Sequence, residues 1–268
     1  MSVSVIIPTY KNPTCLDWCL KSATENQYGD NEIIVVVDGY IEESQDVLDK
    51  YTGLISVLDL GQNCGMPSAI NYGCWSASNE LILVVNDDNV FPHNWDVILE
   101  HDAVDDMMVL SPNQIEANPS IFNFLVKDFG NPDTFDYAGY KLWEVDNRSN
   151  PMTRNGCIFP FLMQKKWYMA VGGFNTIYQS PFVVDWDFFV KLEMIGLHFG
   201  RINKLAFYHF GGQATKNRTD GEEVGFKQSE HDAMATYEYM WGHSPLRHPQ
   251  TNSHKPSGKI KGIDWDSI

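Results

Sequence analysis

Residues 81–89 have the sequence LILVVNDDN, an unbroken apolar run followed at once by amides and carboxylates. Leu81–Val85 predicts a strand that is buried on both faces, because such strands are continuously apolar. The polar residues would then lie at the carboxyl end of a sheet, where α/β proteins bind their ligands. Two interpretations of these polar residues stay open. The adjacent carboxylates are held together by a divalent cation, or they form a solvated turn in which Asp and Asn bond their own backbone.

The chain before this stretch alternates between strand and helix patterns. Four expected strands, three of them nearly continuous apolar runs, predict an α/β fold with a mostly parallel central sheet and helices on both faces. We expect the other strands at Val3–Ile7, Glu32–Val37 and near Leu54–Leu60, and helices from Pro13 to about Gly29, from about Glu42 to Tyr51 and around residues 69–77.

The alternation is lost beyond residue 112. Residues 112–155 lack a clear period and predict a long, variable surface region, whose aromatic residues receive no individual roles. Later segments regain a pattern: regular stretches at Cys157–Met163 and Gln164–Val171, a helix from about Val184 with Phe188, Phe189, Leu192 and Ile195 inward, a strand at Leu205–Phe210, a helix between Glu222 and Trp241, and an extended tail from His243.

Composition excludes several classes of partner and location. The formal net charge of −16 opposes non-specific binding to nucleic acid or anionic lipid, because both are negatively charged. Every apolar run is far shorter than the ~20 residues that span a bilayer, so we expect no integral membrane span. Five cysteines without a CxxC pair favour a reducing compartment, and we expect a cytoplasmic protein. Cys15 and Cys19 are expected to be buried apolar residues rather than ligands.

The ends of parallel strands meet at one edge of a sheet, so residues far apart in sequence should converge. Tyr10, Asp38 and the pair Asp87/Asp88 are predicted to line one crevice. Gly65 and Asn71 bracket the start of the intervening helix, whose free N–H groups could bind a phosphate. The alternative is that Gly65 permits a tight turn and Asn71 bonds a backbone group.

The order of these segments resembles the family 2 glycosyltransferases with a GT-A fold, over about residues 3–212. The resemblance implies a Rossmann-like sheet with a smaller acceptor-side region, divided into a nucleotide-sugar-binding half at 1–112, an acceptor-binding and catalytic half at 113–215, and a C-terminal helix and tail at 216–268. The matching segments are VSVIIPTY at 3–10, EIIVVVDG at 32–39, GMPSAINYG at 65–73, LILVVNDDN at 81–89, VGGFN at 171–175, VVDWDFFVKLEMIG at 183–196 and YHFGG at 208–212.

On the donor side, the resemblance implies that Thr9, Tyr10 and Asp38 contact the base and ribose of a nucleotide sugar, with a UDP-sugar favoured. Asn86-Asp87-Asp88 stands where the family carries its DxD motif, so Asp88 would bind Mn²⁺ or Mg²⁺ beside the diphosphate. Asn86 replaces the first Asp of that motif. The complete set expected to bind donor and cofactor is Pro8, Thr9, Tyr10, Asp38, Gly65, Asn71 and Asp87.

His209 matches a histidine that some relatives use as a late metal ligand. Its flanking residues, Tyr208 and Phe210, equally fit a histidine that lies in the core or supports the site from behind. We therefore predict Asp88 and His209 as the metal-binding pair, with that alternative open.

The run Val183–Asp187 occupies the place of the family's ED-containing motif, whose Asp accepts the proton of the attacking hydroxyl. The resemblance implies Asp185 as the general base, with Trp186 as an apolar wall or a sugar-stacking ring. Asp187 is the competing base, and Val184 replaces the customary Glu. Alternatively, both carboxylates belong only to the acidic first turn of a helix.

These expectations describe a glycosyltransferase that moves a sugar from a nucleoside diphosphate donor to a hydroxyl of a glycan, lipid-linked glycan or protein, with inversion and a divalent metal. Asn86 and Val184 motivate a second hypothesis, a catalytically silent sugar- or nucleotide-binding module on the same fold. Nucleotidyl transfer is a third, although no basic Gly-rich loop follows the first strand.

Overall fold

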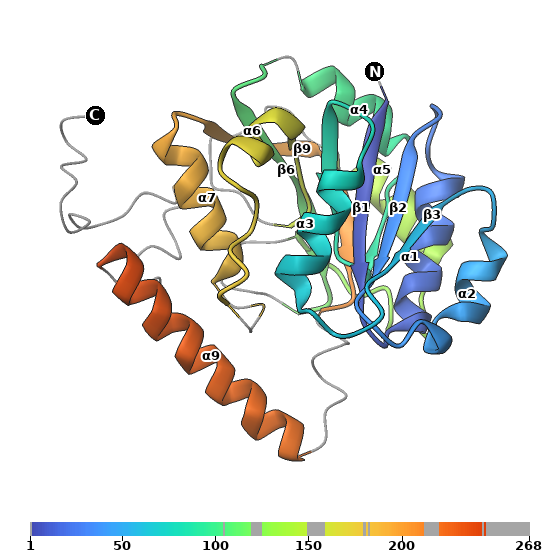
Figure 1. Cartoon of the computed structure of the whole chain (residues 1–268). Coiled ribbons are helices and arrows are strands. Elements are labelled where there is room, and N and C mark those ends of the chain that lie inside the picture. The colour runs from blue at the N-terminus through green and yellow to red at the C-terminus, as the bar shows by residue number, and fades with distance from the viewer. Residues whose placement is uncertain are drawn as a thin grey trace.

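The computed structural model describes residues 2–103, 105–118, 125–148, 159–178, 181, 183–211, 220–242 and 244. Within these ranges, nine strands form one sheet in the order β3-β2-β1-β4-β8-β6-β9-β5, with β7 paired to β6 (Figure 1). The strands are β1 (Val3–Thr9), β2 (Glu32–Val37), β3 (Ser56–Asp59), β4 (Leu81–Val84), β5 (Asn89–Val90), β6 (Met108–Glu116), β7 (Leu125–Val126), β8 (Phe161–Gln164) and β9 (His198–His209).

Helices occupy both faces of this sheet, as expected for an α/β fold. Figure 1 views the face on which α3, α6 and α7 lie in front of the strands. The helices are α1 (Pro13–Glu25), η1 (Ile41–Glu43), α2 (Gln45–Lys50), α3 (Met66–Ser76), α4 (Trp95–Asp102), α5 (Tyr137–Asp146), α6 (Lys165–Ala170), α7 (Val184–Met194) and α9 (Asp220–Trp241).

The sheet is mostly parallel. Strands β1, β2, β3 and β4 run in parallel, and β6 is parallel to both β7 and β9. The antiparallel strand β8 lies between β4 and β6 and joins the two parallel groups. The carboxyl ends of β1, β2 and β4 therefore meet at one edge, as the sequence predicted.

Alternate residues of the buried strands face two apolar clusters, which explains their continuous apolar sequence. In β1, Ile6 packs with residues of α3, α6, α7 and α9, whereas Val5 and Ile7 pack with residues of α1 and α4. Cys15 and Cys19 are buried in α1, which confirms the expectation that they are core residues.

The prediction for residues 112–155 is wrong in its described part. Strand β6 continues to Glu116, and α5 lies where a surface region was expected. Phe129, Phe135 and Tyr140 are buried in a third apolar cluster together with Tyr208. Pairing with β9 shifts register between Pro112 and Asn113, which hides the strand's period in the sequence. Residues 119–124 and 149–158 lie outside the described ranges, and with them Phe122, Phe124 and the start of the regular stretch expected at Cys157–Met163.

Two smaller errors concern the ends of predicted helices. Helix α1 ends at Glu25, before the expected Gly29, and Tyr28 is 83% exposed. Ile195 was expected to face inward but follows the end of α7 and is 42% exposed. The tail expected from His243 lies outside the described residues except for Ser244.

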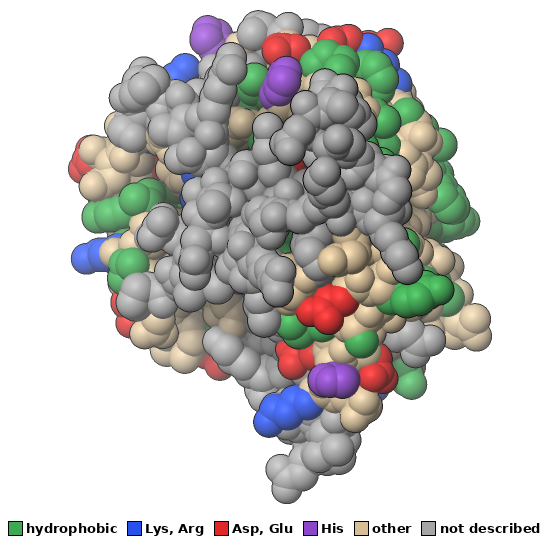
Figure 2. Space-filling view, turned by 90° about the vertical axis from the view of Figure 1, so that its left-hand side faces the viewer, with side chains coloured by type: hydrophobic (Ala, Val, Ile, Leu, Met, Phe, Trp, Pro, Cys, Tyr) green, Lys and Arg blue, Asp and Glu red, His purple; other side chains and the backbone are tan. Residues whose placement is uncertain are grey.

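The described surface carries no continuous basic patch on the face shown in Figure 2, where acidic, basic and apolar side chains are mixed. This agrees with a chain that has 35 acidic and only 19 Lys and Arg residues. Across the ranges that the structure describes, none of the helices combines the length and apolar character needed to cross a bilayer.

Candidate active site

Asp87 joins the tips of β1 and β4. It is 8% exposed, and its carboxylate accepts hydrogen bonds from Thr9 Oγ1 at 2.7 Å and from Asn12 Nδ2 at 3.0 Å. Asn12 precedes α1 but makes no side-chain cap to the helix, because its amide is used here. Burial, with a contribution from the adjacent Asp88, raises the pKa of Asp87 to about 7. Asp87 therefore links the ends of β1 and β4 through hydrogen bonds. That it also contacts a ligand stays a prediction.

Asp88 and His209, the predicted metal-binding pair, lie together. His209 Nε2 is 3.2 Å from Asp88 Oδ1, and His209 Nδ1 is 2.6 Å from Glu116 Oε1. The backbone supports this arrangement, since Phe210 N–H donates to Asp88 O at 3.0 Å and β5 pairs with β9 at Asn89 and His209. Burial lowers the pKa of His209, but the two carboxylates outweigh burial and raise it to about 10.

A divalent cation could occupy this cluster with His209 Nε2 deprotonated, a state that the charge of the ion itself would favour. Metal-binding histidines commonly donate one ring N–H to a carboxylate, which orients the other nitrogen toward the metal. Glu116 and His209 Nδ1 have this relation, and His209 Nε2 points to the side chain of Asp88. The described residues contain no group of three or more His, Cys, Asp and Glu side chains that could hold a metal ion. Asp88 and His209 are the two residues that would bind the ion, and substrate phosphates would supply further oxygen ligands.

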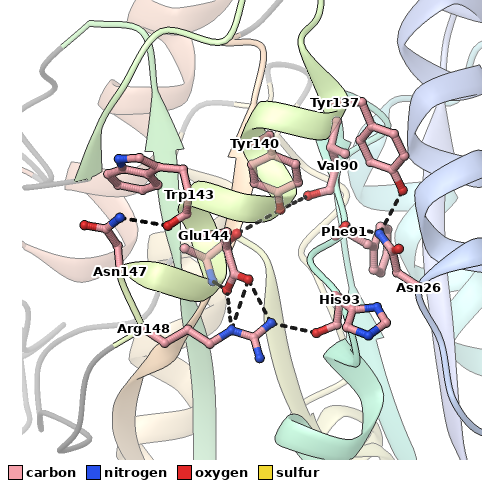
Figure 3. Close-up of polar contacts among 11 residues, drawn as sticks. Asn26, Val90, Phe91, His93, Tyr137, Tyr140, Trp143, Glu144, Asn147 and Arg148 are labelled. Atoms are coloured by element: carbon pink, nitrogen blue, oxygen red, sulfur yellow. Dashed lines mark hydrogen bonds and ion pairs between the residues drawn. The ribbon is translucent and has the colours of Figure 1, made fainter.

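Helix α5 supports the strands that carry this cluster. Tyr140 Oη lies 3.0 Å from Val90 O in β5 and 2.9 Å from Ala206 O in β9, and Glu144 Oε1 accepts from Ala206 N at 3.2 Å (Figure 3). Glu144 is 2% exposed and forms an ion pair with Arg148, whose guanidinium also donates to His93 O. The backbone of β9 three residues before His209 is therefore held by α5.

Replacing Tyr140 by Phe is expected to lower the free energy of unfolding by about 1–3 kcal/mol, because the buried carbonyls of Val90 and Ala206 lose a donor. Urea unfolding measures this loss. Tyr28→Phe, at an 83% exposed side chain, is the control and should change stability by less than about 0.5 kcal/mol. Equal stability of the two variants would contradict the supporting role of α5.

The donor-side residues lie at the tips of β1 and β2. Asp38 N–H donates to Thr9 O at 2.9 Å, and the Asp38 carboxylate accepts from the backbone N–H groups of Cys64 at 2.6 Å and Gly65 at 3.0 Å. Burial raises the pKa of Asp38 despite these bonds. Asp38 therefore holds the loop before α3 against β2. Pro8 is buried in β1 opposite Val36.

Two residues that the sequence analysis missed flank Tyr10. Tyr40 packs edge-on against Tyr10 with ring centroids 5.9 Å apart, and Lys11 Nζ lies 3.8 Å from the centroid of the Tyr40 ring. Lys11 and Tyr40 both have positive φ, at 49° and 59°. Such backbone costs about 1–3 kcal/mol and is concentrated at ligand sites. Tyr40 directly follows the quoted segment 32–39, so its position after a strand end was a usable signal.

Asn71 takes the second of the two roles considered from the sequence. It is 2% exposed, its Oδ1 accepts from Phe174 N at 2.8 Å and from Tyr168 Oη at 2.5 Å, and its Nδ2 donates to Phe174 O at 2.9 Å. These bonds correct the prediction that it binds donor or cofactor, since its amide is used inside the protein. Gly173 is required beside it, because a Cβ there would lie 2.4 Å from Asn71 Oδ1.

Asp185 lies in the first turn of α7, which follows Val183 in the left-handed region. Figure 1 shows α7 beginning at the end of the sheet where β1 and β2 finish. Asp185 is partly exposed, and its Oδ1 accepts from Trp186 N at 2.9 Å. Burial raises the pKa of its carboxyl to about 6. Trp186 is partly buried against the cluster of α3, α6 and α7. A partly accessible carboxylate with a raised pKa has the properties of a general base.

Asp187 does not fit the role of competing base. It is fully buried, and its Oδ1 lies 2.9 Å from Trp241 Nε1 and 3.2 Å from Tyr178 Oη. An acceptor hydroxyl has no access to it. Val184, which stands in place of the customary Glu, is also fully buried and packs in the apolar cluster. Of the two carboxylates in this turn, Asp185 is the one that is partly exposed.

Glu116 was missed because the strand and helix pattern is lost in the sequence beyond residue 112, so its carboxylate was never placed at a strand end. Tyr140 and Glu144 lie in the region without a period, and no sequence signal marked them. Asp187 was named, but its burial depends on Trp241, a residue 54 positions away.

Residues 4–119 match the model described as glycosyl transferase family 2. The chain is 29% identical over 224 residues to an uncharacterized glycosyltransferase of Rickettsia conorii, an alignment that covers 74% of this chain and 32% of that protein. The chain thus spans about a third of the length of that relative.

Solved structures share the fold at low sequence identity. GalNAc-T7, solved with UDP, GalNAc and Mn²⁺, superposes with a TM-score of 0.63 at 13% identity, covering 90% of this chain and 49% of that one. The mannosyltransferase PcManGT of Pyrobaculum calidifontis, solved with GDP-Man and Mn²⁺, gives a TM-score of 0.61 at 14% identity, covering 94% and 68%. Both confirm the predicted α/β architecture of the GT-A type.

Proposed function

We propose that this chain transfers one sugar from a nucleoside diphosphate sugar, with a UDP-sugar favoured, to an acceptor hydroxyl with inversion at the anomeric carbon. The observation that carries the proposal is the pairing of Asp88 and His209, 3.2 Å apart where β4 and β9 end, together with Asp185 in the first turn of α7, a helix that begins at that end of the sheet (Figure 1). The GT-A structures named above were solved with UDP or GDP-mannose and Mn²⁺, which supports this donor class.

In this mechanism each element has a separate task. Tyr10, Tyr40 and Lys11 would hold the nucleoside, and Asp38 would keep the loop before α3 in place beside it. Asp88 and His209 would hold Mn²⁺ or Mg²⁺, and the bound ion would neutralise charge on the departing diphosphate. Asp185 would accept the proton of the acceptor hydroxyl as this oxygen attacks the anomeric carbon, and one displacement inverts the configuration.

The acceptor is proposed to be a hydroxyl of a glycan, lipid-linked glycan or protein. We also propose a cytoplasmic location, which is supported by four described cysteines that are all free.

A panel of UDP-, GDP- and dTDP-sugars with and without Mn²⁺ tests the donor and the metal together. Thermal unfolding should shift upward for one nucleotide only when Mn²⁺ is present, because ligands that bind only the folded state stabilise it. Product analysis then tests the reaction. Release of a nucleoside diphosphate supports glycosyl transfer, release of pyrophosphate would indicate nucleotidyl transfer, and stabilisation without turnover would indicate the silent binding module.

The pH dependence of transfer is expected to report Asp185. Its carboxyl must be ionised to accept a proton, and its pKa is about 6, so kcat/KM should rise with pH through about 6 and level off above it. The measurement is the initial rate of transfer from pH 4.5 to 8.5 at fixed Mn²⁺. A profile that is flat across pH 6, or that falls with rising pH there, would remove Asp185 from this role.

A further inference from the structure

The buried carboxylate of Asp187 lies two residues after Asp185 and takes no part in the proposed reaction. Three segments meet at it: its Oδ1 accepts from Tyr178 Oη at 3.2 Å and from Trp241 Nε1 at 2.9 Å, and its Oδ2 is 3.5 Å from Lys191 Nζ. Tyr178 precedes α7, Lys191 belongs to α7, and Trp241 is the last residue of α9. Asp187 thus connects α7 to α9.

A gain in the stability of the fold does not by itself explain why such a carboxylate is buried. Removing a charge from water costs several kcal/mol even in real proteins, and a well-packed apolar residue often replaces a buried ion pair without loss. A buried, hydrogen-bonded polar group instead restricts how the surrounding elements can be arranged. This argument applies to Asp187, which is fully buried beside the hydroxyl of Tyr178, the indole N–H of Trp241 and the ammonium group of Lys191.

The last turn of α9 contacts the first turn of α7, the turn that carries Asp185, through the bond from Trp241 to Asp187. Trp241 is 8% exposed, and Tyr237, one turn earlier, is 2% exposed. Both belong to the apolar cluster that contains Val183 and Val184, the residues directly before Asp185. Burial raises the pKa of Tyr237, and the charges of Asp187 and Asp185 add to this effect.

The same network continues toward the donor side. Lys191 Nζ donates to Gly173 O at 2.6 Å, in the turn whose Phe174 backbone is bonded to Asn71 of α3. A series of contacts therefore links α9 to α3. A hydrogen bond joins Trp241 to Asp187 and an ion pair joins Asp187 to Lys191. Hydrogen bonds then join Lys191 to Gly173, and the next residue, Phe174, to Asn71. A displacement of α9 would therefore move α7, the helix that carries Asp185, before it moved the turn at Gly173.

We propose that Asp187 is a positioning residue: together with Trp241 and Tyr178 it fixes the first turn of α7, so that Asp185 faces the acceptor hydroxyl, and α9 is therefore part of the acceptor side of the active site. This inference rests on the proposed function of Asp185. It gives α9 a part in catalysis that the family match over residues 4–119 does not reach.

Trp241→Phe tests the inference, because it removes the N–H donor and keeps an aromatic ring. We expect kcat for transfer to fall by about 10- to 10²-fold, the effect of displacing a reacting group by a fraction of an ångström to 1 Å. The thermal shift with nucleotide and Mn²⁺ should be unchanged. The rise of kcat/KM near pH 6 should move, because the groups around this turn, Asp187, Tyr178, Tyr237 and Lys191, would be rearranged.

Asp187→Asn and Tyr178→Phe are the second and third variants, in case Trp241→Phe does not fold. Asp187→Asn keeps an oxygen that can accept from Trp241 and Tyr178, so it should retain more activity than Trp241→Phe. Matched controls are Trp75→Phe, at a 50% exposed tryptophan of α3, and Tyr239→Phe, at a 91% exposed tyrosine of α9. Both should transfer sugar at the wild-type rate.

The outcomes separate this inference from the proposed function. If Asp185→Asn is inactive but folded Trp241→Phe and Tyr178→Phe keep the wild-type kcat and pH profile, and differ only in melting temperature, the inference is overturned and the function stands. If the wild-type protein neither transfers nor hydrolyses any nucleotide sugar with Mn²⁺, the proposed function fails, and with it the inference.

Discussion

Asp185→Asn is expected to lower sugar transfer by about 10²- to 10⁴-fold while leaving donor affinity intact, as typical for loss of a general base. Asparagine has nearly the same shape but cannot accept the acceptor proton. The Asp185 carboxyl accepts a hydrogen bond from Trp186 N in its own turn, and asparagine keeps an oxygen that can accept this bond, so the substitution should leave the fold unchanged. The measurement is kcat for transfer, with calorimetric binding of nucleotide and Mn²⁺ alongside it.

The control for this experiment is Asp232→Asn, at an exposed carboxylate on α9, which should transfer sugar at the wild-type rate. The pH profile adds a second criterion. Any residual activity of Asp185→Asn should lack the rise near pH 6, because the group that titrates there is gone. Normal turnover by this variant would assign the proton transfer to another residue.

The second large effect is expected at the metal-binding pair. Asp88→Asn should weaken Mn²⁺-dependent nucleotide binding by more than the ~10- to 100-fold that loss of a supporting carboxylate behind a metal ligand costs, and turnover should fall with it. Glu116→Gln should show an effect within that range, because Glu116 acts through His209 rather than on the metal. Calorimetric titration with Mn²⁺ and UDP measures both.

Asp46→Asn is the matched control. Asp46 is exposed on α2, which follows β2 and precedes β3, and these two strands lie at the opposite end of the sheet order from β9. The order of effects is the sharper criterion. If Glu116→Gln weakens Mn²⁺ binding more than Asp88→Asn does, then Asp88 is not the ligand and the assignment of the pair is wrong. Binding of nucleotide that is equally strong with EDTA would remove the metal from donor recognition.

The first half of the fold could be predicted well from local patterns. Each of β1, β2 and β4 is a continuous apolar run that ends in polar residues, and β2 was predicted at its observed bounds, Glu32–Val37. A strand buried on both faces must be apolar throughout, so its sequence carries the signal without reference to its partners. The region from β6 to α5 could not be predicted in this way, because β6 changes register beside β9 and α5 is buried through contacts with distant strands. Helices α7 and α9, by contrast, lie where helices were expected, from about Val184 and between Glu222 and Trp241.

The sequence by itself determined the alternation of strand and helix, the edge at which Asp38, Asp87 and Asp88 end their strands, and the acidic first turn of α7. Only the tertiary structure decided which carboxylates can meet a substrate. Asp185 and Asp187 are two positions apart and chemically identical, yet the hydrogen bonds from Tyr178 and Trp241 remove one from solvent. Burial and the pKa shifts that follow from it arise from residues distant in the chain, and a local pattern does not contain them.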